Sequence, residues 1–96
     1  MKDVDFKLII FTSFLGAVRE GVRAIAYECS SDLITIYGYL DRNPEDEDYE
    51  VMDGAVTEIM ASYPKLTQQN IVLEKTDDPI GKLHPYSGWV FVRHED

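Results

Sequence analysis

The 96-residue sequence has few basic residues: nine Lys and Arg stand against eighteen Asp and Glu, and the formal net charge is −9 at pH 7. Polyphosphates and anionic lipids repel a chain of this charge, which disfavours direct binding to nucleic acid or to a membrane surface. A basic protein is the partner that the charge favours.

Cysteine is also scarce. Cys29 is the single cysteine, so the chain cannot form an internal disulfide, as is typical of proteins from a reducing compartment. Long apolar runs are missing as well. The stretch after Asp5 is broken by Lys7 and Thr12, lacks a signal-peptide cleavage site, and is far shorter than the roughly 20 residues of a membrane span. We therefore expect a cytoplasmic protein.

An apolar content of 45% indicates a folded protein rather than a disordered acidic chain, and the length suits a single domain over residues 1–96. A first helix is predicted from about Asp5 to Glu20, because apolar residues recur at spacings of three and four and Gly21 follows as a C-terminal cap. The predicted buried face consists of Leu8, Phe11, Leu15, Val18 and Val22.

Two β-rich runs follow at residues 22–29 and 33–40, and the turn-forming Ser-Ser-Asp between them predicts a hairpin. In the second run neither set of alternating side chains is fully polar. This strand is therefore predicted to be central or to meet a partner on its second face. Two more strands are predicted at residues 70–75 and 89–94, with a long loop between them.

A second helix is predicted from about Pro44 to Ser62, with Asn43 as its cap and Pro44 in the first turn, where no N–H is needed. Its predicted apolar face is Tyr49, Met52, Val56, Ile59 and Tyr63. The element order, helix–strand–strand repeated once, predicts an α+β fold in two layers. We expect a four-stranded, mainly antiparallel sheet with both helices on one face.

The stretch NPEDEDYEVMDG, residues 43–54, holds six carboxylates and no basic residue. One interpretation is an ordinary solvated helix face, since acids near a helix N-terminus are favoured by its dipole. A calcium loop starting at Asp41 is excluded, because Asp46 stands where glycine is needed and Met52 where an acid is needed. The other interpretation is an anionic patch for a basic protein, with Asp46, Glu50 and Asp53 on one stripe of the helix.

Aromatic residues on or beside the predicted strands are candidate anchors, because Tyr and Trp are favoured at protein interfaces. An exposed Tyr37 or Tyr39 beside the acidic helix would make the charged patch specific. His84 and His94 could serve a small hydrolase only if both reached one substrate. Nothing near Cys29 marks an activated nucleophile or a metal ligand. We predict no catalytic residue, no metal site and no cofactor.

Small size, acidity, the α/β pattern and the lack of a catalytic motif together resemble bacterial toxin-immunity proteins, in particular those of contact-dependent growth inhibition systems. The segments PEDEDYEVMD, TIYGYL and HPYSGW would face the partner. The resemblance implies neutralisation of a cognate toxin, often a basic nuclease, inside the producing cell. The predicted partner-binding residues are Asp41, Glu45, Asp46, Glu47, Glu50, Asp53, Tyr37, Tyr39, Tyr86 and Trp89.

An alternative function is a regulatory or structural subunit that docks a basic protein or domain through the same face. In either case the free protein is expected to be a monomer or a weak dimer.

Overall fold

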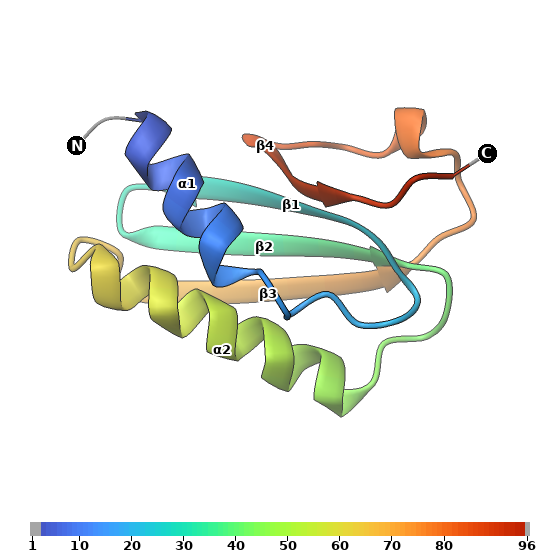
Figure 1. Cartoon of the computed structure of the whole chain (residues 1–96), viewed down its shortest axis with the longest axis horizontal. Coiled ribbons are helices and arrows are strands. Elements are labelled where there is room, and N and C mark those ends of the chain that lie inside the picture. The colour runs from blue at the N-terminus through green and yellow to red at the C-terminus, as the bar shows by residue number, and fades with distance from the viewer. Residues whose placement is uncertain (1–2, 96) are drawn as a thin grey trace.

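The computed structural model describes residues 3–95, and side chains at residues 6–95. Four strands form one sheet in the order β3-β2-β1-β4 (Figure 1). Strand β1 pairs antiparallel with β2 and β4, whereas β2 and β3 are parallel. The elements are α1 (Asp3–Ser13), β1 (Val22–Ser30), β2 (Leu33–Leu40), α2 (Asp46–Ser62), β3 (Gln68–Lys75), a 3-10 turn (Ile80–Lys82) and β4 (Gly88–Val92).

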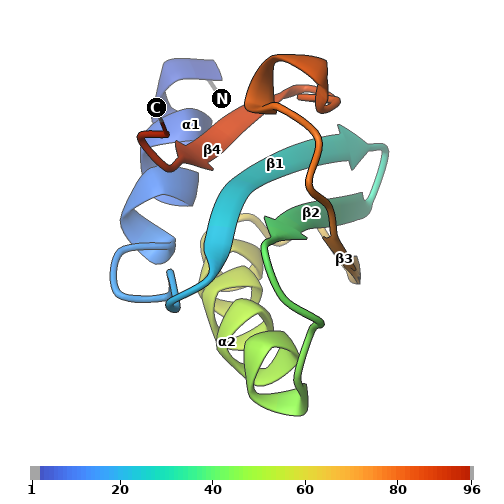
Figure 2. The same ribbon diagram turned by 90° about the vertical axis from the view of Figure 1, so that its right-hand side faces the viewer.

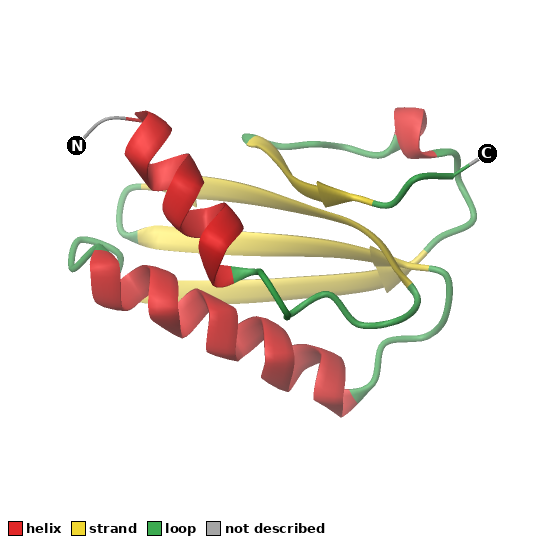
Figure 3. Cartoon of the chain, in the orientation of Figure 1, coloured by secondary structure: helices red, strands yellow, loops and turns green. Residues whose placement is uncertain are grey.

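Both helices cover one face of the sheet (Figures 1 and 3). The segment between β3 and β4 runs along the other face, as the view from the side shows (Figure 2). The predicted α+β class, with a mixed four-stranded sheet and two helices, is confirmed. The one parallel pair follows from the long connection through α2, because parallel neighbours need a crossover rather than a tight turn.

The predicted hairpin is confirmed. Pairing of β1 with β2 extends from Val22 opposite Leu40 to Ser30 opposite Leu33, and Ser31 adopts a φ of 55° in the turn between them. Strand β2 is central, as the mixed character of its two faces predicted.

The main core lies between the sheet and the helices. Alternate residues of β2, namely Ile34, Ile36 and Leu40, are fully buried and belong to the same cluster as Met52 and Val56 of α2. Burying an aliphatic side chain of this size contributes about 1.5–3 kcal/mol. The other residues of β2 point to the opposite face, because side chains alternate along a strand.

A smaller core lies on that opposite face. Ala24, Tyr39 and Leu83 form its buried part, and Ile80 and Trp89 pack against it. Leu83 and Ile80 belong to the segment between β3 and β4, which therefore closes the second face of the sheet with apolar contacts.

Helix α1 is shorter than predicted. It ends at Ser13 rather than near Glu20, and Gly16 follows with a φ of 84°. Gly21, the predicted cap, lies instead directly before β1, with a φ of 93°. Both glycines adopt the left-handed conformation that glycine tolerates best, and the earlier of the two lies in the turn that follows the helix.

The predicted buried face of α1 is wrong. Its buried residues are Ile10 and, just beyond the helix end, Phe14, with Phe6 and Ile9 partly buried against the same core. The predicted residues Leu8, Phe11, Leu15 and Val18 are exposed, whereas Val22 is buried in β1. Apolar residues occur on both sides of this helix, and the core takes the set spaced Phe6, Ile10, Phe14.

Helix α2 begins at Asp46, with Glu45 rather than Asn43 at its cap. The Glu45 backbone N–H donates to Asp48 Oδ2 at 2.7 Å, so the carboxylate of Asp48 satisfies a donor at the helix start. On the predicted apolar face, Met52, Val56 and Ile59 are buried. Tyr63 is partly buried, but Tyr49 is exposed.

Candidate binding surface on the second helix

An acidic stripe runs along the outside of α2. It consists of Asp46, Glu50 and Asp53, whose side chains are all exposed. Within the part of the chain that the structure describes, none of these three carboxylates forms an ion pair. They lie on the side of the helix away from the buried Met52 and Val56. We call these three residues the α2 acidic stripe.

Asp48, in the same run of acids, is only 1% exposed. The guanidinium of Arg42 forms hydrogen bonds with both carboxylate oxygens of Asp48: Nη1 donates to Oδ2 at 2.7 Å and Nη2 donates to Oδ1 at 2.8 Å. Arg19 donates to Oδ1 at 2.6 Å. The hydrogen bond from Arg42, followed by those from the Glu45 backbone and Arg19, holds the pKa of Asp48 well below its usual range, although burial opposes the shift.

Three predicted partner-binding acids are neutralised in part within the fold. Glu47 pairs with Arg19 at 2.7 Å, and Glu45 lies 3.5 Å from the same guanidinium. Asp41 accepts a hydrogen bond from Arg93 at 2.9 Å. Their side chains stay exposed, so they can meet a partner, but they carry less free charge than the α2 acidic stripe.

The arginines are the residues that sequence reasoning missed. All four arginines of the chain form ion pairs with carboxylates, at Arg19, Arg23, Arg42 and Arg93. Partners 29 residues apart, such as Arg19 and Asp48, cannot be found from spacings along one helix. The only signal in the sequence is that these arginines stand at strand ends: Arg19 just before β1 and Arg23 at its start, Arg42 just after β2, and Arg93 just after β4.

A second arginine cluster closes the end of the sheet. Arg23 is buried and donates to Glu95 through Nε at 2.9 Å and Nη2 at 2.8 Å, and through Nη1 to the carbonyl of Thr76 at 2.7 Å. Arg93 also donates to Glu95, at 2.8 Å. Hydrogen bonding by Arg23, with a further contribution from Arg93, lowers the pKa of Glu95 to about 2.

Of the predicted aromatic anchors, Tyr37, Tyr39 and Tyr86 lie on the opposite face of the sheet from the helices, so they do not join the α2 acidic stripe. Trp89 packs against Tyr39 on that face and also lines a hollow beside Phe11 of α1. Tyr39 is 4% exposed, and its hydroxyl donates to the carbonyl of His84 at 2.9 Å. It meets the ring of Trp89 edge-on, with centroids 6.0 Å apart. Burial raises the pKa of Tyr39 to about 12. Tyr39 is therefore a core residue, and the condition stated for a specific patch, an exposed tyrosine beside the acidic helix, is not met by Tyr39.

Tyr37 and Tyr86 form a separate aromatic stack that is partly exposed. Their rings are parallel within 5° with centroids 3.5 Å apart, and His84 stacks on Tyr86 with centroids 4.1 Å apart. The Tyr37 hydroxyl donates to Glu28 at 3.3 Å. Val72, on β3, lines a small hollow with both tyrosines. This aromatic stack is a second candidate surface.

The two histidines do not share a pocket. His94 lines an open groove of about 570 Å³ together with Arg93 and Glu95, and His84 is not part of its lining. The Nδ1 atom of His84 accepts a hydrogen bond from the backbone N–H of Tyr86 at 2.8 Å. The convergence of both histidines on one substrate, which a hydrolase would need, is not found.

Cys29 is half-buried against the main core, and burial raises the pKa of its thiol to about 11. A thiol with a raised pKa is a poor nucleophile at neutral pH, because only the thiolate reacts. Among the described residues there is no group of three or more His, Cys, Asp or Glu side chains placed to hold a metal ion. In the described chain no helix is both long and apolar enough to cross a membrane.

A family model described as MafI2 immunity protein matches residues 3–95, nearly the whole chain. No curated protein matches the sequence. The predicted general class, a bacterial toxin-immunity protein, is confirmed by this match. Its narrower type, that of contact-dependent growth inhibition, is not confirmed, because the Maf family is a different system. Of the three functions considered from the sequence, the family supports the toxin inhibitor and suggests that it acts without catalysis.

Proposed function

We propose that this chain, which belongs to the MafI2 immunity protein family, neutralises a basic toxin domain by binding it through the α2 acidic stripe. The family makes it an immunity protein, and an immunity protein has a cognate toxin as its partner.

The proposal rests on one observation: the arginines of the fold pair with some of its acids but not with those of the α2 acidic stripe. The arginines are all held by Asp41, Asp48, Glu95 and their neighbours. Asp46, Glu50 and Asp53 have no such partner in the described chain, although repulsion among acids three and four residues apart destabilises a helix by about 0.2–0.5 kcal/mol per pair. A basic partner would relieve this repulsion, whereas folding does not.

A nuclease is the toxin class that suits such a surface. Proteins that bind nucleic acid present Lys and Arg to the phosphates, so an acidic helix docked on these residues would exclude the substrate by charge and by volume. Complementary charges also accelerate encounter and suppress wrong partners. Asp41, Glu45 and Glu47 would extend the contact at its rim, where their charge is already shared with Arg19 and Arg93.

Binding requires no catalytic group, metal or cofactor in the inhibitor. We expect the protein to act in the cytoplasm of the producing cell, where the toxin would otherwise reach nucleic acid. We expect the free protein to be a monomer or a weak dimer. The stacked Tyr37 and Tyr86 remain a second candidate contact on the opposite face of the sheet.

The test is titration of an inactivated cognate toxin with the variant carrying Asp46→Lys, Glu50→Lys and Asp53→Lys. Charge reversal removes attraction and adds repulsion, so we expect affinity to fall by at least about 100-fold. Protection of cells that express the active toxin should fail in parallel. The fold should persist, because these side chains point away from the core; circular dichroism checks this.

The matched control carries Glu74→Lys, Asp77→Lys and Asp78→Lys. It changes the net charge by the same amount, but its sites lie at the end of β3 and in the loop after it rather than on α2. We expect a loss of less than about fivefold from long-range electrostatics alone. If a folded stripe variant binds like the wild type while the control loses affinity, the contact lies on the Tyr37 and Tyr86 face and the proposal is wrong.

A further inference from the structure

Helix α1 presents large apolar side chains to solvent. Leu8 is 62% exposed, Phe11 is 46% exposed and Leu15, two residues beyond the helix end, is 78% exposed. The spacing of Leu8 and Phe11 places them on one side of α1, and the exposed Leu15 follows in the turn after the helix. The core is filled instead by Ile10 and Phe14. We call Leu8, Phe11 and Leu15 the α1 apolar face.

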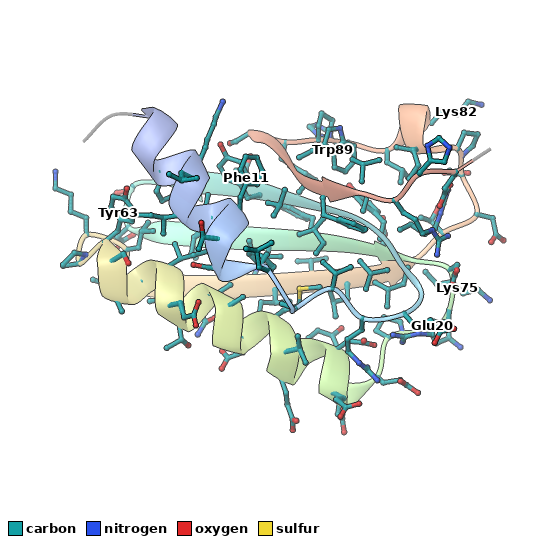
Figure 4. The ribbon with its side chains drawn as sticks, in the orientation of Figure 1. Phe11, Glu20, Tyr63, Lys75, Lys82 and Trp89 are labelled. Atoms are coloured by element: carbon teal, nitrogen blue, oxygen red, sulfur yellow. The ribbon has the colours of Figure 1, made fainter. Side chains whose placement is uncertain are left out.

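Among the described residues, the main core does not include the α1 apolar face. Single exposed apolar residues are ordinary, but several neighbouring large ones mark an interaction surface. Beside Phe11 the surface is hollowed: a depression of about 130 Å³ is lined by Lys7, Phe11, Tyr27 and Trp89, among others. Phe11 and Trp89 border it from α1 and β4 respectively (Figure 4). A side chain of a partner could enter this depression.

The α1 apolar face and the acids of α2 belong to the same layer of the molecule. Helices α1 and α2 lie next to each other on one face of the sheet (Figures 1 and 2), and Arg19, from the segment after α1, is tied to Glu47 and Asp48 of α2. One partner resting on the helices could therefore contact apolar side chains on α1 and carboxylates on α2.

Net charge distinguishes between the two kinds of partner that could cover this layer, a second copy of the chain and a basic protein. A second copy of this chain would bring another formal charge of −9 against the first, and its own acids would meet the acids of α2, which disfavours association. A basic protein with an apolar centre matches both parts of the layer. Interfaces of this kind have an apolar middle surrounded by a charged rim.

We propose that the α1 apolar face is the anchor that the cognate toxin buries, with Phe11 at its centre. This inference rests on the proposed function and adds to it the residues that hold the complex together after encounter. The two sets of residues then have separate kinetic roles. Acids at the rim govern the association rate, whereas buried apolar anchors govern the dissociation rate.

The experiment measures association and dissociation rates of an inactivated cognate toxin with the variant carrying Leu8→Gln, Phe11→Gln and Leu15→Gln. We expect dissociation to accelerate by at least about 30-fold, the size of effect expected of a central hot spot. The association rate and its dependence on salt should stay within about threefold, because no charge is changed.

The matched control carries Val92→Gln, an exposed apolar residue on β4 that belongs to neither candidate surface. It removes apolar surface elsewhere and should leave both rates unchanged. An unchanged dissociation rate in a folded α1 variant would overturn the inference, while the α2 stripe variant still reports on the proposed function. If sedimentation shows a wild-type dimer that the α1 variant dissociates, the occupant is a second copy and the inference is also overturned.

Discussion

At the scale of single residues, Asp48 is the buried carboxylate among the residues that the structure describes. It accepts hydrogen bonds from Arg42, Arg19 and the Glu45 backbone, and so joins the segment after α1, the end of β2 and the start of α2. A buried carboxylate is stable only where such partners compensate for lost hydration. Asp48 is therefore a structural acid, although it sits within the run that looks uniformly like a binding patch.

The variant Asp48→Asn should lower the free energy of unfolding by about 2–4 kcal/mol. It removes the buried charge that Arg19 and Arg42 share, and leaves these arginines only the exposed carboxylates of Glu45 and Glu47 as counterions. Urea denaturation measures the loss. The neighbouring Asp46→Asn is the control and should change stability by less than about 0.5 kcal/mol, because its side chain is exposed. Equal stability of the Asp48 variant and the wild type would contradict the assignment of a structural role.

Acid should weaken the same contacts. The pKa of Asp48 and the pKa of Glu95 are both lowered in the folded protein, the latter to about 2 from 4.5. A carboxyl group with a lowered folded pKa stabilises the fold above its unfolded pKa, and this contribution disappears as pH falls toward the folded pKa. The free energy of unfolding should therefore be flat with respect to Glu95 above about pH 5.5 and fall from pH 4.5 to pH 2.

The measurement is urea denaturation across this pH range for the wild type and for Glu95→Gln. The variant should be less stable at pH 7 and should depend less steeply on pH below 4.5, because the titrating group is gone. Parallel pH profiles for the two proteins would show that Glu95 does not contribute to acid sensitivity.

At the scale of elements, the sequence predicts the type of each helix and strand better than its ends and faces. Strand-forming runs and turn residues were sufficient to predict the β1–β2 hairpin. The spacing of Met52, Val56 and Ile59 was sufficient to predict the buried face of α2. Helix α1 has apolar residues at helical spacing on two different sides, so the spacing alone does not show which side is buried. Only the tertiary fit decides that Ile10 and Phe14 are buried and that Leu8 and Phe11 are exposed.

The start of α2 shows a second limit. Asn43 followed by Pro44 has the local chemistry of a helix start, but the helix begins after Glu45. The choice is made by Asp48, which the two arginines fix in place and which then caps the Glu45 N–H. Local preferences could not reveal this, because Arg19 is far away in the sequence.

This difference gives a prediction for Asn43. Replacing an asparagine at a helix cap by Ala usually costs about 1 kcal/mol. Since Glu45 holds the cap position, Asn43→Ala should change the free energy of unfolding by less than about 0.5 kcal/mol. Thermal or urea denaturation of the purified variant checks this. A loss near 1 kcal/mol or more would mean that Asn43 caps the helix after all.

At the scale of the whole molecule, the sheet separates two kinds of surface. The helical layer carries the α2 acidic stripe and the α1 apolar face, and the other side carries the stack of Tyr37 and Tyr86. The sequence indicated that acids and aromatics were present but not that the sheet keeps them apart. Strand alternation could have placed Tyr37 and Tyr39 on one face together, yet which face meets the helices depends on the packing of the whole chain.

The central claim is that toxin binding is steered by the α2 acidic stripe. The most direct measurement is the association rate of the cognate toxin at salt concentrations from about 50 mM to about 500 mM, where screening removes most steering. For the wild type we predict a fall of at least about tenfold across this range. For the variant with Asp46→Lys, Glu50→Lys and Asp53→Lys we predict a slow rate that stays level or rises with salt. The same steep fall in both folded proteins would contradict the claim.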